Sequence, residues 1–212
     1  MQVKTIFKSF IDYISKVNST LETELVYKSQ YELIVAIILS AQCTDKRVNI
    51  ITPALFENCP NFTVMNTTSK DVIFDLIKSC SYPNNKSKHL KGLASLIIDK
   101  FNGEIPSDFD TLIKLPGIGR KTANVFLSVI HNQPTMPVDT HVNRLAKRIG
   151  FVSEKANLLK VEQELTKNIP DHLLNKTHHW LILHGRYVCK ARKPMCNDCQ
   201  ISSFCKYFNS NM

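Results

Sequence analysis

Apolar side chains recur every three or four residues along most of this chain, which is the spacing of an amphipathic α-helix. In the first such segment, six apolar residues would share one face: Val3, Ile6, Phe7, Phe10, Ile11 and Ile14. The spacing returns in residues 31–43, 46–58, 69–79, 87–101, 107–115, 120–130, 139–150, 157–169 and 172–189. Connections are short, and no segment alternates as a strand would. The sequence predicts an all-α protein of about ten helices, with Asp45 as the N-cap of the segment 46–58.

The balance of charge points to a polyanionic partner. The 212 residues include 27 Lys and Arg against 18 Asp and Glu, which gives a net charge of +9. Such an excess favours nucleic-acid binding, although a lysine-rich surface can also serve solubility alone.

Nothing in the sequence indicates a membrane or secreted protein. The longest apolar run, Leu33–Leu39, is far shorter than the roughly 20 residues that span a bilayer, and the first ten residues lack the pattern of a signal peptide. We therefore expect a cytoplasmic protein with no membrane partner. Its seven cysteines should be reduced or bound to metal rather than paired in disulfides.

A glycine-containing turn interrupts the helical pattern where the sequence reads LPGIGRKTA. Gly117 and Gly119 can both take positive φ, which suits a tight turn between two helices. The first N–H groups of the second helix would then point outward and offer a site for a phosphate oxygen. Arg120 and Lys121 add positive charge on the same side. The alternative is an ordinary corner between two helices with a glycine C-cap.

The segment PVDTHVNRLAKR follows closely and begins a further helix. Asp139 stands at its expected N-cap position, where the helix dipole keeps a carboxylate in place and ionised. His141 and Arg144 lie on the same segment, where they could contact phosphate or simply face solvent.

Four cysteines crowd the end of the chain, where the helical pattern stops. Cys189, Cys196, Cys199 and Cys205 have the spacing C-x6-C-x2-C-x5-C, so four thiolates could surround one metal centre. This spacing alone leaves zinc and an iron–sulfur cluster as alternatives. The other three cysteines are scattered, and the histidines at 178, 179 and 184 lack the i, i+4 spacing of a helical metal pair.

Taken together, LPGIGRKTA, VDTH, LSAQCTD and the cysteine tail after HHWLILHGRYVC resemble the endonuclease III family of helix–hairpin–helix DNA glycosylases. The resemblance runs from about residue 30 through Cys205 and implies a bacterial-type, nucleoid-associated monomer that carries a 4Fe–4S cluster on the four cysteines. It makes Lys121 the catalytic lysine and Asp139 the catalytic aspartate. An amine attacks only when neutral, and a free lysine has a pKa of about 10.4. A helix N-terminus and a neighbouring cation favour the neutral form.

The resemblance also implies how the protein would hold duplex DNA that has lost a base from its stack. Gln42 would enter the gap, and Tyr82 stands where the family has a second wedge. That loop, CSYPNNKSK, departs from the family, because Ser81 replaces a usual glycine and Pro83 a usual aromatic residue; a plain surface loop is the alternative. Beyond the first cluster cysteine, Lys190, Arg192 and Lys193 would face DNA.

The implied architecture is two helical lobes with a DNA-binding cleft between them, flanked by Lys121 and Asp139. One lobe would be a six-helix bundle over residues 22–132, with the helix–hairpin–helix at about 108–130. The other would join residues 1–21 to 133–212 and include the cluster module, 189–205.

The implied activity is that of a bifunctional glycosylase and AP lyase. It would excise oxidised pyrimidines from double-stranded DNA, act also on abasic sites, and cleave the strand 3′ to the lesion. Two alternatives remain: a monofunctional adenine or mismatch-thymine glycosylase, against which Lys121 argues, and a non-catalytic helix–hairpin–helix DNA-binding module.

Overall fold

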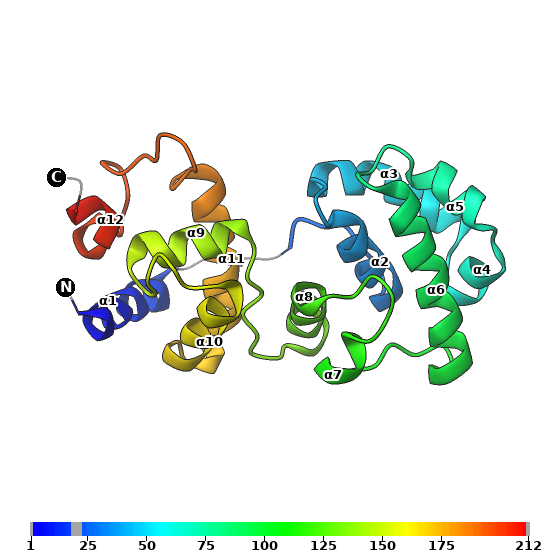
Figure 1. Cartoon of the computed structure of the whole chain (residues 1–212), viewed down its shortest axis with the longest axis horizontal. Coiled ribbons are helices and arrows are strands. Elements are labelled where there is room, and N and C mark those ends of the chain that lie inside the picture. The colour runs from blue at the N-terminus through cyan, green and yellow to red at the C-terminus, as the bar shows by residue number, and fades with distance from the viewer. Residues whose placement is uncertain (1, 18–22, 211–212) are drawn as a thin grey trace. The chain divides into compact units, whose positions relative to one another are not determined.

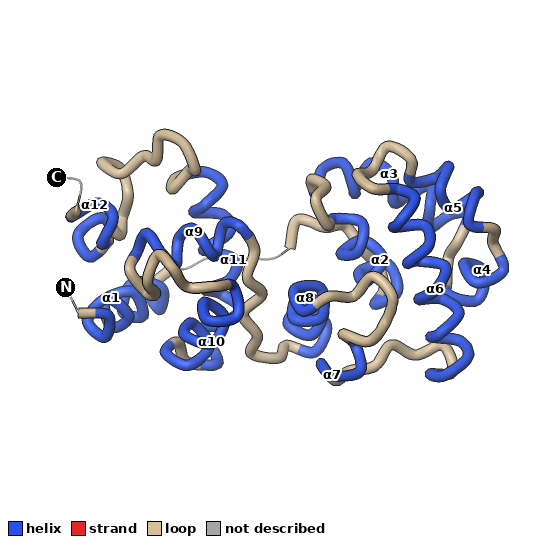
Figure 2. The backbone as a smooth tube through the Cα atoms, in the orientation of Figure 1, coloured by secondary structure: helices blue, strands red, loops and turns tan. Residues whose placement is uncertain are grey.

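The computed structural model describes residues 2–17 and 23–210, and every regular element within these ranges is helical (Figure 2). The predicted all-α class is therefore confirmed. The described residues divide into two compact units. We call residues 23–131 the central unit, and residues 2–17 with 132–210 the terminal unit. In the part of the chain that the structure describes, no helix has the length and apolar character to cross a bilayer.

The central unit is built around one largely buried helix. It comprises α2 (Gln30–Ser40), α3 (Asp45–Asn58), α4 (Phe62–Thr67), α5 (Lys70–Ile77), α6 (Pro83–Phe101), α7 (Phe109–Leu112) and α8 (Arg120–His131). Residues 33–39 of α2 are all buried, because α3, α6 and α8 pack around that helix (Figure 1). This apolar run hence forms a core helix, which explains why its sequence shows no polar face.

The terminal unit joins the two ends of the chain. It contains α1 (Val3–Lys16), α9 (Thr140–Ile149), α10 (Leu158–Asn168), α11 (Asp171–Tyr187), the 3₁₀ helix η1 (Ser202–Phe204) and α12 (Lys206–Asn209). Helix α11 packs against both α1 and α9 (Figure 1). Phe10 of α1 is completely buried, and its ring contacts Phe151 and Trp180 with centroids 5.1 and 5.4 Å apart. The first helix is thus an integral part of a core formed mainly by C-terminal residues.

Several helix boundaries differ from those predicted. Thr44, not Asp45, is the N-cap of α3, and its side chain accepts a hydrogen bond from the Arg47 N–H at 3.2 Å. The predicted helix over 107–115 is a single turn, α7, followed by turns. Helix α6 begins at Pro83, inside the segment predicted as a loop, because proline is favoured in a first helical turn. The short helices α4, η1 and α12 were not predicted.

Candidate nucleic-acid interface

The turn between α7 and α8 requires glycine at one position. Gly117 has a φ of +79°, and a Cβ there would lie 2.9 Å from Cβ of His89 on α6. Both its backbone conformation and the space beside it therefore exclude a side chain. Gly119 could also have taken a positive φ, but in the structure its φ is not positive. A Cβ on Gly119 would meet nothing within 4 Å, so the backbone there faces open space.

Two cations stand at the start of α8. Arg120 and Lys121 are both exposed, whereas Ala123, Phe126 and Leu127 of the same helix are buried in the core. The N–H of Ala123 donates to the Gly119 carbonyl at 3.0 Å, so the N–H groups of residues 120–122 precede the helix's own hydrogen-bonding ladder. The Arg120 guanidinium also lies 4.8 Å from the centre of the Phe109 ring. Positive charge and the positive end of a helix dipole thus coincide at this turn.

Four of the predicted DNA-binding residues line one groove of the central unit. Gln42, Tyr82, Gly117 and Gly119 contribute to its wall, and its volume is about 370 Å³. The other lining residues are Ile38, Ala41, Asn85, Lys86, His89 and Ile118. Tyr82 is 59% exposed, and both Gln42 and Tyr82 have a φ of 54°, in the left-handed region. Residues about 40 positions apart in the sequence are therefore brought to the same groove as the glycine turn.

Tyr82 is not in the middle of a loop, as the sequence suggested. It is the N-cap residue of α6, and its side chain makes no capping hydrogen bond. The backbone of Tyr82 is therefore joined directly to a helix of 19 residues, which restricts its position.

In the terminal unit, Asp139 caps α9. Its Oδ1 accepts a hydrogen bond from the Val142 N–H at 2.8 Å, and its backbone is extended. The predicted N-cap is therefore confirmed. This bond fixes the carboxylate at the positive end of α9 while the residue keeps partial exposure.

Arg144 faces the cysteine segment. Its guanidinium donates to the Gly185 carbonyl at 2.8 Å and to the Cys189 carbonyl at 3.2 Å, and lies 3.2 Å from His141 Nδ1. Helices α9 and α11 approach closely here, since a Cβ on Gly185 would lie 2.9 Å from Cβ of His141. These bonds anchor the end of α11 to α9; phosphate contact by His141 and Arg144 stays a prediction.

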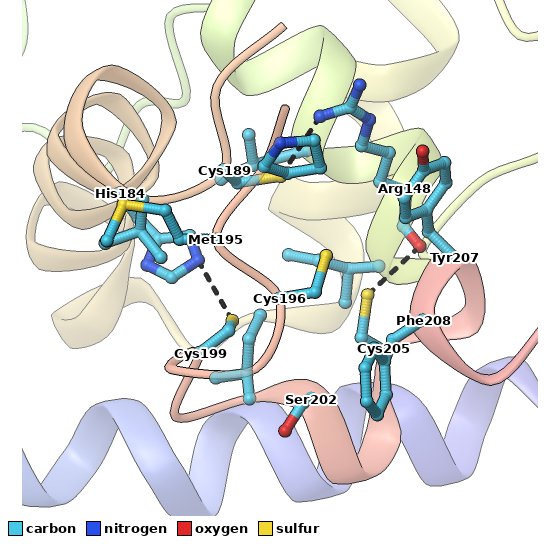
Figure 3. Close-up of a pocket in the computed structure, with 15 residues that line it drawn as sticks. Arg148, His184, Cys189, Met195, Cys196, Cys199, Ser202, Cys205, Tyr207 and Phe208 are labelled. Atoms are coloured by element: carbon cyan, nitrogen blue, oxygen red, sulfur yellow. Dashed lines mark hydrogen bonds between the residues drawn. The ribbon is translucent and has the colours of Figure 1, made fainter. Parts of the chain in front are cut away.

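The four predicted ligand cysteines line a single pocket (Figure 3). Arg148 approaches this pocket from α9, with its guanidinium 3.4 Å from Cys189 Sγ. On the other side, His184 Nε2 lies 3.4 Å from Cys199 Sγ, and burial lowers the pKa of His184 to about 4. Burial raises the pKa of the thiols of Cys199 and Cys205. The pocket thus gathers thiols from a segment of 17 residues into partly buried surroundings.

The loop after Cys189 is held by Arg148, which the sequence did not single out. Its guanidinium donates to the carbonyls of Lys190 at 2.7 Å and Ala191 at 3.0 Å. Arg192 and Lys193 follow and are exposed. Arg148 stands one helical turn after Arg144, and this i, i+4 spacing was the available signal that both face the same element.

Comparison with known proteins agrees with these features. The family model of the HhH-GPD superfamily base excision DNA repair proteins matches residues 35–171. The chain therefore belongs to the HhH-GPD superfamily. It is 46% identical over 210 residues to endonuclease III of Rickettsia felis, covering 99% of this chain and 98% of the relative. It is 42% identical over 196 residues to that of Bacillus subtilis, covering 92% and 90%. Within the superfamily, the chain is a member of the endonuclease III family.

Solved structures give the same relationship. A trapped endonuclease III–DNA covalent intermediate, an estranged-adenine complex, matches with a TM-score of 0.93 and 40% identity, covering 100% of both chains. A thermostable thymine-DNA glycosylase matches with a TM-score of 0.85 and 21% identity, covering 98% of this chain and 97% of that chain. The second likeness shows a shared fold alone.

The geometry at the hairpin turn predicts unequal effects of two glycine substitutions. Gly117→Ala should lower the free energy of unfolding by about 1–3 kcal/mol, because it combines positive φ with a contact against His89. Gly119→Ala is the matched control, and should leave stability within about 1 kcal/mol of wild type. Urea unfolding followed by circular dichroism measures both. Equal stability of the two variants would contradict the described turn.

Proposed function

We propose that this protein is a bifunctional DNA glycosylase and AP lyase of base excision repair that acts on oxidised pyrimidines. The observation that carries the proposal is the position of Lys121. Its amine is exposed on the first turn of α8, directly after the Gly117 turn, where N–H groups and Arg120 attract a phosphate. A trapped covalent intermediate in the similar endonuclease III–DNA structure supports the same chemistry.

The reaction follows from an amine nucleophile at a sugar carbon. Neutral Lys121 attacks C1′ of the damaged nucleotide, the glycosidic C–N bond breaks, and the base leaves with its electron pair and takes a proton. The sugar ring then opens to give an iminium ion between Lys121 and C1′. Loss of a proton from C2′ expels the 3′ phosphate by β-elimination, and water releases the lysine.

Asp139 would supply negative charge. A carboxylate stabilises the positive charge that develops on the deoxyribose as the base departs, and can accept a proton from the attacking group. The hydrogen bond from the Val142 N–H engages Oδ1, so the helix cap and the proposed electrostatic role are compatible.

The remaining predicted residues would bind DNA. The turn at Gly117 and Gly119, with Arg120, would hold the backbone without reading sequence. Gln42 and Tyr82, which share the groove with that turn, would fill the gap left by the extruded nucleotide. His141, Arg144, Arg192 and Lys193 would add phosphate contacts. Because the proposed substrate is damaged double-stranded DNA, we propose that the protein is associated with the nucleoid.

A 4Fe–4S cluster on the four cysteines is the proposed cofactor. In the described ranges, no group of three or more His, Cys, Asp or Glu side chains is arranged to hold a single metal ion, although four thiols line one pocket. Four thiols can hold either zinc or an iron–sulfur cluster, and membership of the endonuclease III family favours the cluster. Positive iron would also offset the burial that disfavours thiolates here.

Borohydride trapping tests the function. With a duplex that carries one thymine glycol, wild type should give a covalent adduct and Lys121→Ala none, because the Schiff base needs that amine. Lys114→Ala is the matched control, since Lys114 is also exposed near the turn, and it should trap normally. If wild type and Lys121→Ala both release the base and neither forms an adduct, the protein is a monofunctional glycosylase. If the protein binds DNA but releases no base and forms no adduct, even on a duplex with an abasic site, it is a non-catalytic DNA-binding module.

Asp139→Asn separates charge from capping. Asparagine caps a helix about as well as aspartate, so the melting temperature should stay close to that of wild type. Base release should fall by about 100-fold or more, because the negative charge and the proton acceptor are lost. Single-turnover kinetics on the same duplex measures this, with affinity for undamaged DNA as the control. A normal rate would remove Asp139 from the mechanism.

The cofactor is tested by metal content. Purified anaerobically, the protein should contain about four iron and four sulfide per chain, and Cys199→Ala should lose most of both. Cys43→Ala, a thiol in the other unit, should retain them. One zinc per chain, with no sulfide, would overturn the cluster assignment.

A further inference from the structure

Lys86, on the first turn of α6, has a side chain that is only 4% exposed. Lysine is rarely buried, because removing an ammonium from water is costly unless the protein replaces its hydrogen bonds. Lys86 is one of the residues that line the groove of Gln42 and Tyr82, but filling a gap in DNA does not itself require a buried lysine there.

The ammonium of Lys86 binds the end of α2. Its Nζ donates to the carbonyls of Leu39 at 2.8 Å and Ala41 at 2.7 Å. Carbonyls at a helix C-terminus carry partial negative charge, which a cation stabilises. This end of α2 leads directly into Gln42, so the lysine holds the backbone immediately before one of the two proposed gap-filling residues.

The same ammonium also reaches the segment that carries the other gap-filling residue. Nζ lies 3.3 Å from Ser81 Oγ and 3.4 Å from Cys80 Sγ. The backbone N–H of Lys86 donates to the Tyr82 carbonyl at 3.1 Å. One residue is therefore bonded to both segments, through its side chain and its main chain.

Ser81 completes a bridge between the segments. Its hydroxyl donates to the Gln42 carbonyl at 2.6 Å as well as lying beside Lys86. A glycine at this position could not make that bond. The Ser81 side chain thus links the two chain segments that carry Gln42 and Tyr82.

Gln42 and Tyr82 need such support, because both hold an unfavourable backbone conformation. Each has a φ of 54°, which costs a residue with a Cβ free energy and persists only where surrounding bonds maintain it. The bonds from Lys86 and Ser81 fall on the carbonyls of residues 41, 42 and 82, at the two strained positions and their immediate neighbour.

We propose that Lys86, assisted by Ser81, is a positioning residue that fixes the spacing of Gln42 and Tyr82 and so determines how well the protein fills the gap in a damaged duplex. This inference rests on the gap-filling part of the proposed function. It assigns Lys86 no contact with the reacting atoms, because its ammonium is occupied by the protein's own oxygen and sulfur atoms.

The test compares Lys86→Met with Lys86→Arg and Ser81→Ala. Affinity is measured by fluorescence anisotropy on a duplex with a tetrahydrofuran abasic analogue opposite 2-aminopurine, and on the undamaged duplex. Lys86→Met should bind the abasic duplex about tenfold more weakly, with a smaller rise in 2-aminopurine fluorescence, and the undamaged duplex as wild type does. Lys86→Arg should recover most of the loss, since it keeps a buried donor cation.

Ser81→Ala removes only one hydroxyl. It tests the same set of bonds if Lys86→Met fails to fold. It should weaken abasic-duplex binding by about threefold. The inference is wrong if Ser81→Ala and Lys86→Met both bind the abasic duplex as wild type does. It is also wrong if Lys86→Met fails to fold and Ser81→Ala binds that duplex normally. An equal loss on damaged and undamaged duplexes would also overturn it, because that pattern indicates general destabilisation.

Gln42→Ala and Tyr82→Ala distinguish a failure of this inference from a failure of the gap-filling proposal on which it rests. If both weaken abasic binding but the Lys86 and Ser81 variants do not, the gap-filling proposal stands and the inference is wrong. If neither Gln42→Ala nor Tyr82→Ala has an effect, gap filling itself is wrong, and the inference falls with it. The combined Gln42→Ala/Lys86→Met variant should lose less than the sum of the single losses, because both act on one contact.

Discussion

The burial of residues 33–39 of α2 on every side is the constraint on which the central unit depends. Because residues 33–39 have no exposed face, three helices must pack around them, and both ends of α2 must emerge at defined points of the surface. The C-terminal end emerges beside the Gly117 turn, where Gln42 and Tyr82 share a groove with it. An apolar core element thereby determines where the polar elements proposed to bind DNA are displayed.

The two units hold an irregular segment in the same way. In the central unit, the buried ammonium of Lys86 binds carbonyls at a helix end. In the terminal unit, Arg144 and Arg148 of α9 bind carbonyls of the cysteine segment. Each case uses a cation with several donors to satisfy carbonyls that no helix or sheet can satisfy. Ile201 and Phe204 anchor the end of the cysteine segment in the apolar core, and the residues before them rely on this support and on the proposed metal centre.

Helices with a long apolar face, such as α1 and α9, could be predicted because periodicity over three turns is a strong signal. Helix α4 was missed, since six residues are too few to show a period. Thr44 and Asp45 are both good caps, so the sequence could not decide between them. Lys86 was missed for a physical reason: a lone lysine on a helix normally faces solvent, and its carbonyl partners lie 45 and 47 positions away.

The contribution of α1 to the terminal unit has a consequence for synthesis on the ribosome. The central unit is one continuous stretch of chain and can fold as soon as residue 131 has emerged. Helix α1, by contrast, is made first but must wait for Phe151 and Trp180 before its apolar face is covered. Until those residues have emerged, the nascent chain carries an uncovered apolar segment, which is a natural target for chaperones.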